Sequence, residues 1–202
     1  MNAAEEAFPV REATAADVDA VVDTFTTAFF HDPVWGPVFP DAERRAEQAA
    51  PMWRVYTTAA LRHRWLLVTP DVEAAAVWIP AGEEELTARE AAELDGLLER
   101  AAGPAVAHEI HAIGKQFEAA RPTEPHFYLT ILGTHDRHRG KGLGMRLLAA
   151  GLERVDALGA PVYLESTNPA NLERYASVGF TPHGRITTAS GQVVTTMWRP
   201  AR

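Results

Sequence analysis

The stretch THDRHRGKGLGMRLL, residues 134–148, gathers positive charge and glycine at the start of an apolar helical pattern. A glycine inside a helix costs about 1 kcal/mol relative to alanine. Gly140, Gly142 and Gly144 therefore need a reason other than helix stability. Glycine lets the backbone approach a ligand closely, and the first N–H groups of a helix have no partner within it. With the helix dipole these groups form an anion site suited above all to phosphate.

The positive charge of this stretch opposes the charge of the whole chain. Formal net charge is −8 over 202 residues, which argues against a nucleic-acid partner held by Lys and Arg on phosphates. A small anionic ligand still binds where the local field is positive. The basic side chains that supply this field through charge-assisted contacts are Arg137, Arg139, Lys141 and Arg146.

Composition sets the general class. A 47% hydrophobic chain of this length can bury one core, and we expect a single domain over residues 1–202. No run approaches the ~20 apolar residues of a membrane span, so no membrane partner is expected. The first 13 residues lack a cationic segment, which argues against a secretory signal. Cysteine is absent, which excludes disulfides, thiolate metal sites and cysteine nucleophiles. We expect a cytoplasmic protein.

Hydrophobic periodicity and turn residues predict the order of elements. The first half should contain a strand near residue 10, a helix to about 29, a helix over 43–63, a hairpin over 65–80 and two helices within 84–120. The run Glu83–Glu84–Glu85 is interpreted as a solvated helix start. The second half should contain a strand over 126–133, a helix to about 158, a strand over 162–166, a short helix ending at Gly179, and a hairpin over 181–199.

This order implies an α+β fold with a mixed, largely antiparallel sheet, because hairpins alternate with a crossover helix. In the helix that follows the glycine-rich stretch, five apolar side chains should face the core. They are Leu147, Leu148, Leu152, Val155 and Leu158.

Three phosphate-binding motifs compete for residues 137–144. The P-loop pattern GxxxxGK[ST] fails because no Ser or Thr follows Lys141, and the Rossmann pattern GxGxxG fails because Met145 replaces its last glycine. The third pattern, [RQ]xxGx[GA], is satisfied from Arg137 and again from Arg139. This motif resembles the pyrophosphate loop of the GNAT N-acetyltransferase superfamily, and we favour the register Arg137–Gly140–Gly142.

A second segment strengthens the resemblance. LESTNPANLERYASVGF, residues 164–180, is similar to the strand, Asn-containing cap and helix that follow the loop in that superfamily. Five segments are also similar to the antibiotic-modifying branch that includes puromycin N-acetyltransferase: AFFHDP, AAAVWIP, EPHFYLTILG, RGKGLG and YLESTNPANLERYASVGF. Residues 126–180 carry most of the likeness, whereas residues 31–63 and the middle helices match more weakly.

The resemblance implies a GNAT fold in which acetyl-CoA lies between splayed parallel strands, here 127–133 and 162–166. Backbone groups of Leu132, Gly133 and Thr134 would align the pantetheine arm, and the amides of residues 137–142 would hold the pyrophosphate. Asn168 and Asn171 would face the pantetheine or adenylate side. The full set expected in the loop is Arg137, His138, Arg139, Gly140, Lys141, Gly142, Leu143 and Gly144. The acceptor side should involve residues 25–65 and 73–120.

The chemistry of amine acetylation requires three groups. A developing oxyanion needs a fixed donor, for which the amide near Leu132 is a candidate. The departing thiolate needs an acid, and Tyr175 stands at the family's acid position; the alternative role for a lone helical tyrosine is packing. The amine needs a proton acceptor, with Glu165 the first choice and Glu73 the second, while solvated surface carboxylates are the alternative. His126 and Tyr128 are further pocket candidates.

Other patterns carry less information. His108 and His111 lack the spacing of a metal site, so no metal is expected, and His135 and His138 are interpreted as loop residues. His31–Asp32 resembles half of a hydrolase triad, but no nucleophile motif completes it. A set of aromatic side chains could line an acceptor pocket or pack the core: Trp35, Phe39, Trp53 and Trp78.

We therefore predict an acetyl-CoA-dependent N-acetyltransferase that acts on a primary amine of a small molecule, for example an aminonucleoside-like compound. A non-catalytic acyl-CoA-sensing or partner-binding module on the same fold is the alternative, and a longer acyl donor is also compatible with the loop. The choice between monomer and homodimer stays open.

Overall fold

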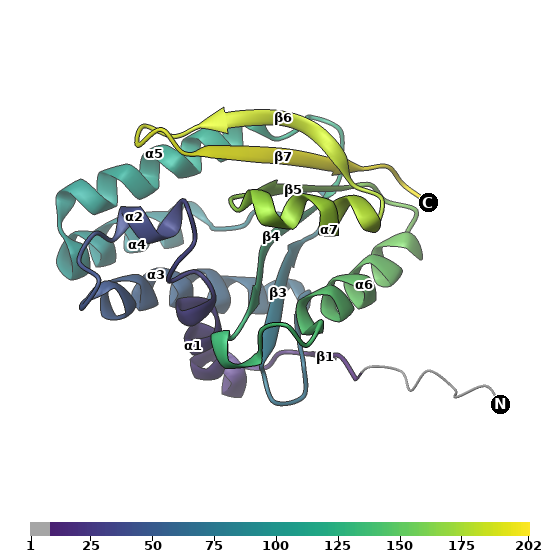
Figure 1. Cartoon of the computed structure of the whole chain (residues 1–202), viewed down its shortest axis with the longest axis horizontal. Helices are drawn as coiled ribbons and strands as arrows, with labels where there is room; N and C mark the ends of the chain where they lie inside the picture. Colours follow the sequence, from purple (N-terminus) through teal and green to yellow (C-terminus); the bar gives the residue numbers. More distant parts are fainter. Residues whose placement is uncertain (1–8) are drawn as a thin grey trace.

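The computed structural model of the protein describes residues 9–202. Most of the N-terminal stretch for which we expect no secretory signal lies outside these residues. The described residues form a seven-stranded sheet flanked by helices (Figure 1). None of the described helices is both long and apolar enough to cross a bilayer.

The sheet has the order β1-β2-β3-β4-β5-β7-β6. Its strands are β1 (Arg11–Glu12), β2 (Leu66–Val68), β3 (Ala74–Ile79), β4 (Phe127–Thr134), β5 (Val162–Ser166), β6 (Thr181–Thr187) and β7 (Val193–Arg199). β4 and β5 are parallel, and the other neighbouring pairs are antiparallel. The predicted α+β class with a mixed, largely antiparallel sheet is confirmed.

Helices cover both faces of the sheet. They are α1 (Val18–Ala28), α2 (Trp35–Val38), α3 (Arg45–Ala60), α4 (Ala88–Ala102), α5 (Pro104–Ala120), α6 (Leu143–Asp156) and α7 (Leu172–Ser177). Short 3-10 turns lie at Ala15–Asp17, Leu61–His63, Asp136–His138 and Pro169–Asn171. Alternate residues of β3 and β5 enter two separate cores, one with α1, α3, α4 and α5 and the other with α6 and α7. Figure 1 shows α1 and α6 on opposite sides of β3 and β4.

Local signals in the sequence explain where α4 and α5 begin and end. The Thr87 hydroxyl accepts a hydrogen bond from the Glu90 amide, and the Glu90 carboxylate accepts one from the Thr87 amide, so Thr87 caps α4. Gly103 follows α4 with φ +91°, and Pro104 opens α5. The predicted pair of helices within 84–120 is therefore confirmed, with its break at Gly103.

Two local predictions were wrong. Leu158 lies beyond the end of α6 at Asp156 and is 61% exposed, because the helix stops before this position can turn toward the sheet. The run Glu83–Glu85 is not a helix start, since α4 begins at Ala88. Instead the Glu85 side chain turns inward, where it pairs with Arg121 (2.9 Å) and accepts a hydrogen bond from Thr130.

Trp78 belongs to the core beneath α6 and does not line an acceptor pocket. Its indole is fully buried with Leu147, Leu148 and Leu152. A Cβ atom built on Gly151 of α6 would stand 2.4 Å from Cζ2 of this indole. Gly151 therefore lets α6 approach the sheet closely at Trp78.

A buried ion pair fastens the last strand to two helices. Arg199, 2% exposed, donates to both carboxylate oxygens of Asp156 at 2.6 and 2.8 Å. Its Nε also donates to the carbonyl of Val178 at 2.9 Å, just after α7. One side chain on β7 thus fixes the end of α6 and the end of α7.

Candidate active site

β4 and β5 separate along their length and leave a free strand edge. They pair at three positions, the last being Leu129 with Leu164, although β4 continues to Thr134 and β5 to Ser166. The amide of His135 donates to the carbonyl of Glu73, on the β3 side. Because successive amides alternate between the two edges of a strand, the amides of Leu132 and Thr134 point to the edge that faces β5.

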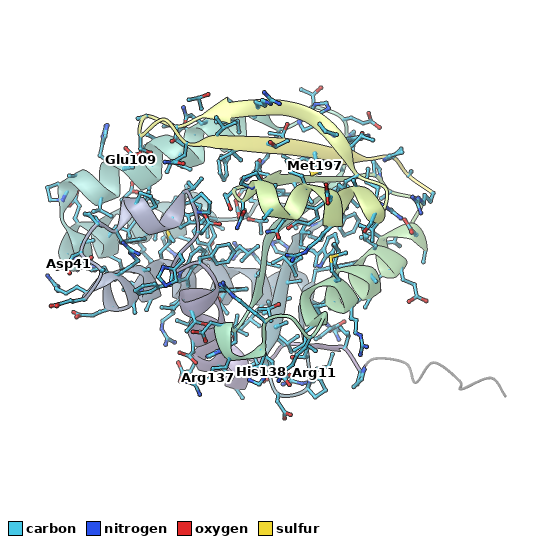
Figure 2. All side chains as sticks on the ribbon, viewed as in Figure 1. Arg11, Asp41, Glu109, Arg137, His138 and Met197 are labelled. Carbon is cyan, nitrogen blue, oxygen red and sulfur yellow. The ribbon has the colours of Figure 1, made fainter. Side chains whose placement is uncertain are left out.

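A cavity of about 510 Å³ opens along this edge. Its lining includes most of the residues predicted to hold acetyl-CoA: Leu132, Gly133, Thr134, His138, Arg139, Gly140, Gly142, Leu143, Gly144, Asn168, Asn171 and, as the candidate acid, Tyr175. The side chains of Arg137 and Lys141 are not part of that lining, and both residues are exposed. Figure 2 shows Arg137 and His138 at the rim of the molecule, on the loop between β4 and α6. We call this space the donor cavity.

The loop amides divide into two groups. Those of Arg137, His138 and Arg139 already donate within the loop, to His135 Nδ1 and to the carbonyls of His135 and Asp136 respectively. Within the described residues, the amides from Gly140 to Met145 have no hydrogen-bond acceptor in the protein. In this conformation the amides available to an anion therefore lie at 140–145, later than the expected 137–142.

The backbone of this loop fits a bound phosphate group. Gly140 and Gly142 have φ values of +79° and +74°, and no atom lies within 4 Å of a Cβ built on either. Their left-handed conformation favours glycine, and the open space lets a ligand reach the backbone. These residues would hold the pyrophosphate, while the free edge of β4 would receive the pantetheine arm. Among the described residues, no group of three or more His, Asp or Glu is placed to hold a metal ion.

A second, smaller cavity of about 110 Å³ adjoins the first, and we call it the acceptor cavity. It lies among α1, α3, α5, β4 and β5. Five residues line both cavities: Phe29, Asp32, Leu132, Asn171 and Tyr175. A group bound at this junction would be accessible from either cavity.

Tyr175 lies at the junction with its phenol protonated. Burial raises the pKa of Tyr175 to about 12, and the negative charge of Asp32 adds to that rise. Its ring also packs edge-to-face on Phe180 (centroids 5.9 Å apart). The phenol thus keeps its proton at neutral pH and can donate it.

Asp32 was not expected at the site. It is 8% exposed, and Oδ1 accepts hydrogen bonds from the amides of Val34 and Trp35 while Oδ2 accepts one from the Thr167 hydroxyl at 2.7 Å. The carboxylate therefore connects the segment after α1 to the segment after β5. Its sequence signals were its place in the AFFHDP segment, at the break after the first helix, and within the expected acceptor region 25–65.

Glu165 faces the acceptor cavity from β5. Burial raises its pKa to about 7, against the opposing effects of the Tyr128 phenol and the Arg121 guanidinium. Its Oε1 atom is buried and has no hydrogen-bond partner among the described residues. A carboxyl group with this pKa is about half ionised at neutral pH and can accept a proton there.

Glu85 and Arg121 complete this wall of the cavity and were not expected there. The Arg121 guanidinium lies over the Tyr128 ring, 4.0 Å from its centroid, and pairs with Glu85. No pattern in the sequence links residues 85 and 121, because only the packing of α4, α5 and β4 brings them together. Glu73, the second choice for a base, lines neither cavity and accepts a hydrogen bond from Thr69 at 2.6 Å.

The comparisons with known proteins agree with this geometry. Residues 92–180 match the model of the family described as Acetyltransferase (GNAT) family. A structure from Corynebacterium glutamicum, described as histone acetyltransferase HPA2 and related acetyltransferase, is 25% identical, covers 96% of each chain and has a TM-score of 0.67.

Two more distant structures show the same fold. Arylalkylamine N-acetyltransferase 2 from Aedes aegypti is 14% identical, with 96% of this chain and 99% of that chain covered and a TM-score of 0.70. A polyamine N-acetyltransferase from Drosophila melanogaster is 17% identical, with 95% and 99% covered and a TM-score of 0.61. Residues 92–180, less than half of the chain, are therefore similar to GNAT acetyltransferases, enzymes that depend on acetyl-CoA, and the chain has the fold of such enzymes.

Proposed function

We propose that the protein transfers an acetyl group directly from acetyl-CoA to the primary amine of a small molecule. The observation that carries this proposal is the meeting of the donor and acceptor cavities at Tyr175 and Leu132. An amine in the smaller cavity would reach a thioester in the larger one at the point where these two residues lie. Direct transfer then needs no covalent intermediate on the protein.

Each reacting proton has a partner at this junction. As the amine nitrogen bonds to the thioester carbonyl carbon, the carbonyl oxygen would become an oxyanion that accepts a hydrogen bond from the Leu132 amide. The carbon–sulfur bond would then break as the carbonyl double bond forms again. Tyr175 gives its proton to the departing sulfur. Glu165 takes the proton that the amine loses, directly or through water. The Tyr175 phenol then recovers a proton from solvent.

Two observations support a small-molecule acceptor. The lining of the acceptor cavity includes residues between 29 and 56 and between 85 and 117, which lie within the acceptor regions expected from the sequence, 25–65 and 73–120. Its volume, about 110 Å³, is small beside the donor cavity. The names of the fold relatives include arylalkylamine and polyamine N-acetyltransferases at similar identity, 14% and 17%, so they do not choose between acceptor classes. The likeness to the puromycin-modifying branch adds aminonucleosides to the candidates.

The test is the Tyr175→Phe variant. We expect kcat for acetyl transfer, followed by release of free thiol, to fall about 100-fold or more, the usual contribution of a general acid. The acetyl-CoA dissociation constant, measured by calorimetry, should stay within twofold of the wild type because the phenol does not hold the pyrophosphate. Full kcat at neutral pH in this variant would exclude Tyr175 as the acid.

A further inference from the structure

We propose that the acceptor is an arylalkylamine: one ammonium group on a short chain that carries a single flat aromatic ring. This inference rests on the proposed function and narrows its acceptor class. Three features of the acceptor cavity carry it: the number of available carboxylate oxygens, the aromatic wall, and the place of Arg121.

The carboxylates of the acceptor cavity indicate where the ammonium group of the acceptor would bind. Three carboxylates line the cavity, those of Asp32, Glu85 and Glu165. Asp32 already accepts three hydrogen bonds, and Glu85 is held by Arg121 and Thr130. Glu165 keeps one buried oxygen without a partner in the described residues. A buried ammonium needs such a partner, so Glu165 is the carboxylate that would bind the ammonium group of the acceptor.

Several lining side chains of the acceptor cavity are aromatic. They come from the residue after α1 and from α2, α3 and α5, and we call them the aromatic wall: Phe29, Trp35, Trp53, Tyr56 and Phe117. Phe29 stacks on Trp53 with centroids 4.9 Å apart, and the Trp35 indole stands edge-on to Trp53 (5.9 Å) and Phe117 (6.3 Å). Such a wall offers faces and edges to a flat ring, in the offset and edge-to-face geometries that aromatic pairs prefer.

Arg121 argues against a second cation. Its guanidinium lines the same cavity, and its buried Nε–H has no hydrogen-bond partner among the described residues. A diamine bound at Glu165 would place its far ammonium either against apolar rings or near this positive group. The carboxylate beside Arg121, that of Glu85, is already paired with this guanidinium.

The experiment compares four amines with acetyl-CoA, with thiol release as the readout: 2-phenylethylamine, 2-cyclohexylethylamine, 1,5-diaminopentane and puromycin. We expect kcat/KM for 2-phenylethylamine to exceed that of each of the others by at least tenfold. In Trp35→Leu, kcat/KM for 2-phenylethylamine should fall about tenfold while that for the diamine changes less than twofold. Trp65→Leu is the matched control, since Trp65 packs on Phe127 outside both cavities, and it should leave the ratio of the two rates unchanged.

The outcomes separate this inference from the proposed function. A preference for the diamine or for puromycin, or equal rates with the phenyl and cyclohexyl amines, overturns the arylalkylamine while leaving amine acetylation intact. Acetyl-CoA binding by calorimetry without thiol release for any amine contradicts the proposed function itself. An unchanged amine preference in a folded Trp35→Leu protein, checked by its melting temperature, removes the aromatic wall as the determinant.

Discussion

At the scale of single residues, the proposed mechanism assigns proton transfer to two groups, Tyr175 and Glu165, whose pKa values are raised by burial. Burial keeps the Tyr175 phenol protonated and brings the pKa of Glu165 to about 7. The sequence singled out Tyr175 from its position in the motif that resembles the family, and Glu165 as a carboxylate at the end of a predicted central strand. It could not reveal the Asp32–Thr167 contact or the Glu85–Arg121 pair, since these join residues far apart in the chain.

The pH dependence of the reaction tests the role of Glu165. A base works only when ionised, so kcat/KM should rise as pH increases through about 7, the pKa of Glu165, and level off above it. In Glu165→Gln the rise of kcat/KM with pH should disappear and kcat at pH 8 should be lower, with acetyl-CoA binding unchanged. If a folded Glu165→Gln protein shows the same rise of kcat/KM with pH, another group is the base.

At the scale of elements, the order of helices and strands could be predicted from the periodicity of hydrophobic residues and from turn residues. The break between α4 and α5 at Gly103–Pro104 is an example. The two wrong local predictions, for Glu85 and Leu158, have their causes in the tertiary structure. The residues next to Glu85 in the sequence predict a solvent-exposed carboxylate, but in the structure this side chain points inward and accepts hydrogen bonds from Arg121 and Thr130. Leu158 fits the helical period, yet α6 ends two residues earlier.

The contact between α6 and the sheet gives a stability test. Gly151→Ala would push a methyl group into the Trp78 indole, and we expect the free energy of unfolding to fall by about 2 kcal/mol, as overpacking typically costs. Gly114→Ala is the matched control on α5, where no atom lies within 4 Å of the new Cβ. It should raise the unfolding free energy by up to about 1 kcal/mol through helix propensity. Urea denaturation measures both, and equal effects would contradict the packing argument.

At the scale of the whole molecule, the Arg199–Asp156 pair connects the layers. Asp156→Asn leaves a buried guanidinium with weaker compensation, so we expect a loss of about 3 kcal/mol of unfolding free energy. Asp19→Asn removes an exposed pair with Arg54 and should have little effect. Hydrogen bonding to Arg199 lowers the pKa of Asp156 from its ordinary value of 3.8. Its contribution is therefore present above that pH and is lost as pH falls further.

Urea melts at pH 7 and at pH 2–3 check this whole-molecule prediction. The difference between wild type and Asp156→Asn should be large at neutral pH and should shrink at low pH. A difference that does not depend on pH would assign the effect to packing. The sequence alone gave no sign of this pair, because an Arg near the end of a strand is usually solvated.

The pairing of β5 also bears on the order in which the site is assembled. β5 has three paired positions with β4 but five with β7. The β5 wall of the acceptor cavity is therefore secured chiefly by a strand that leaves the ribosome after the loop over residues 137–144, α6 and α7. A nascent chain that stops before residue 193 would hold every residue of the donor loop and still lack the partner strand that positions Glu165. Acetylation should therefore appear in a single late step during synthesis, when β7 docks.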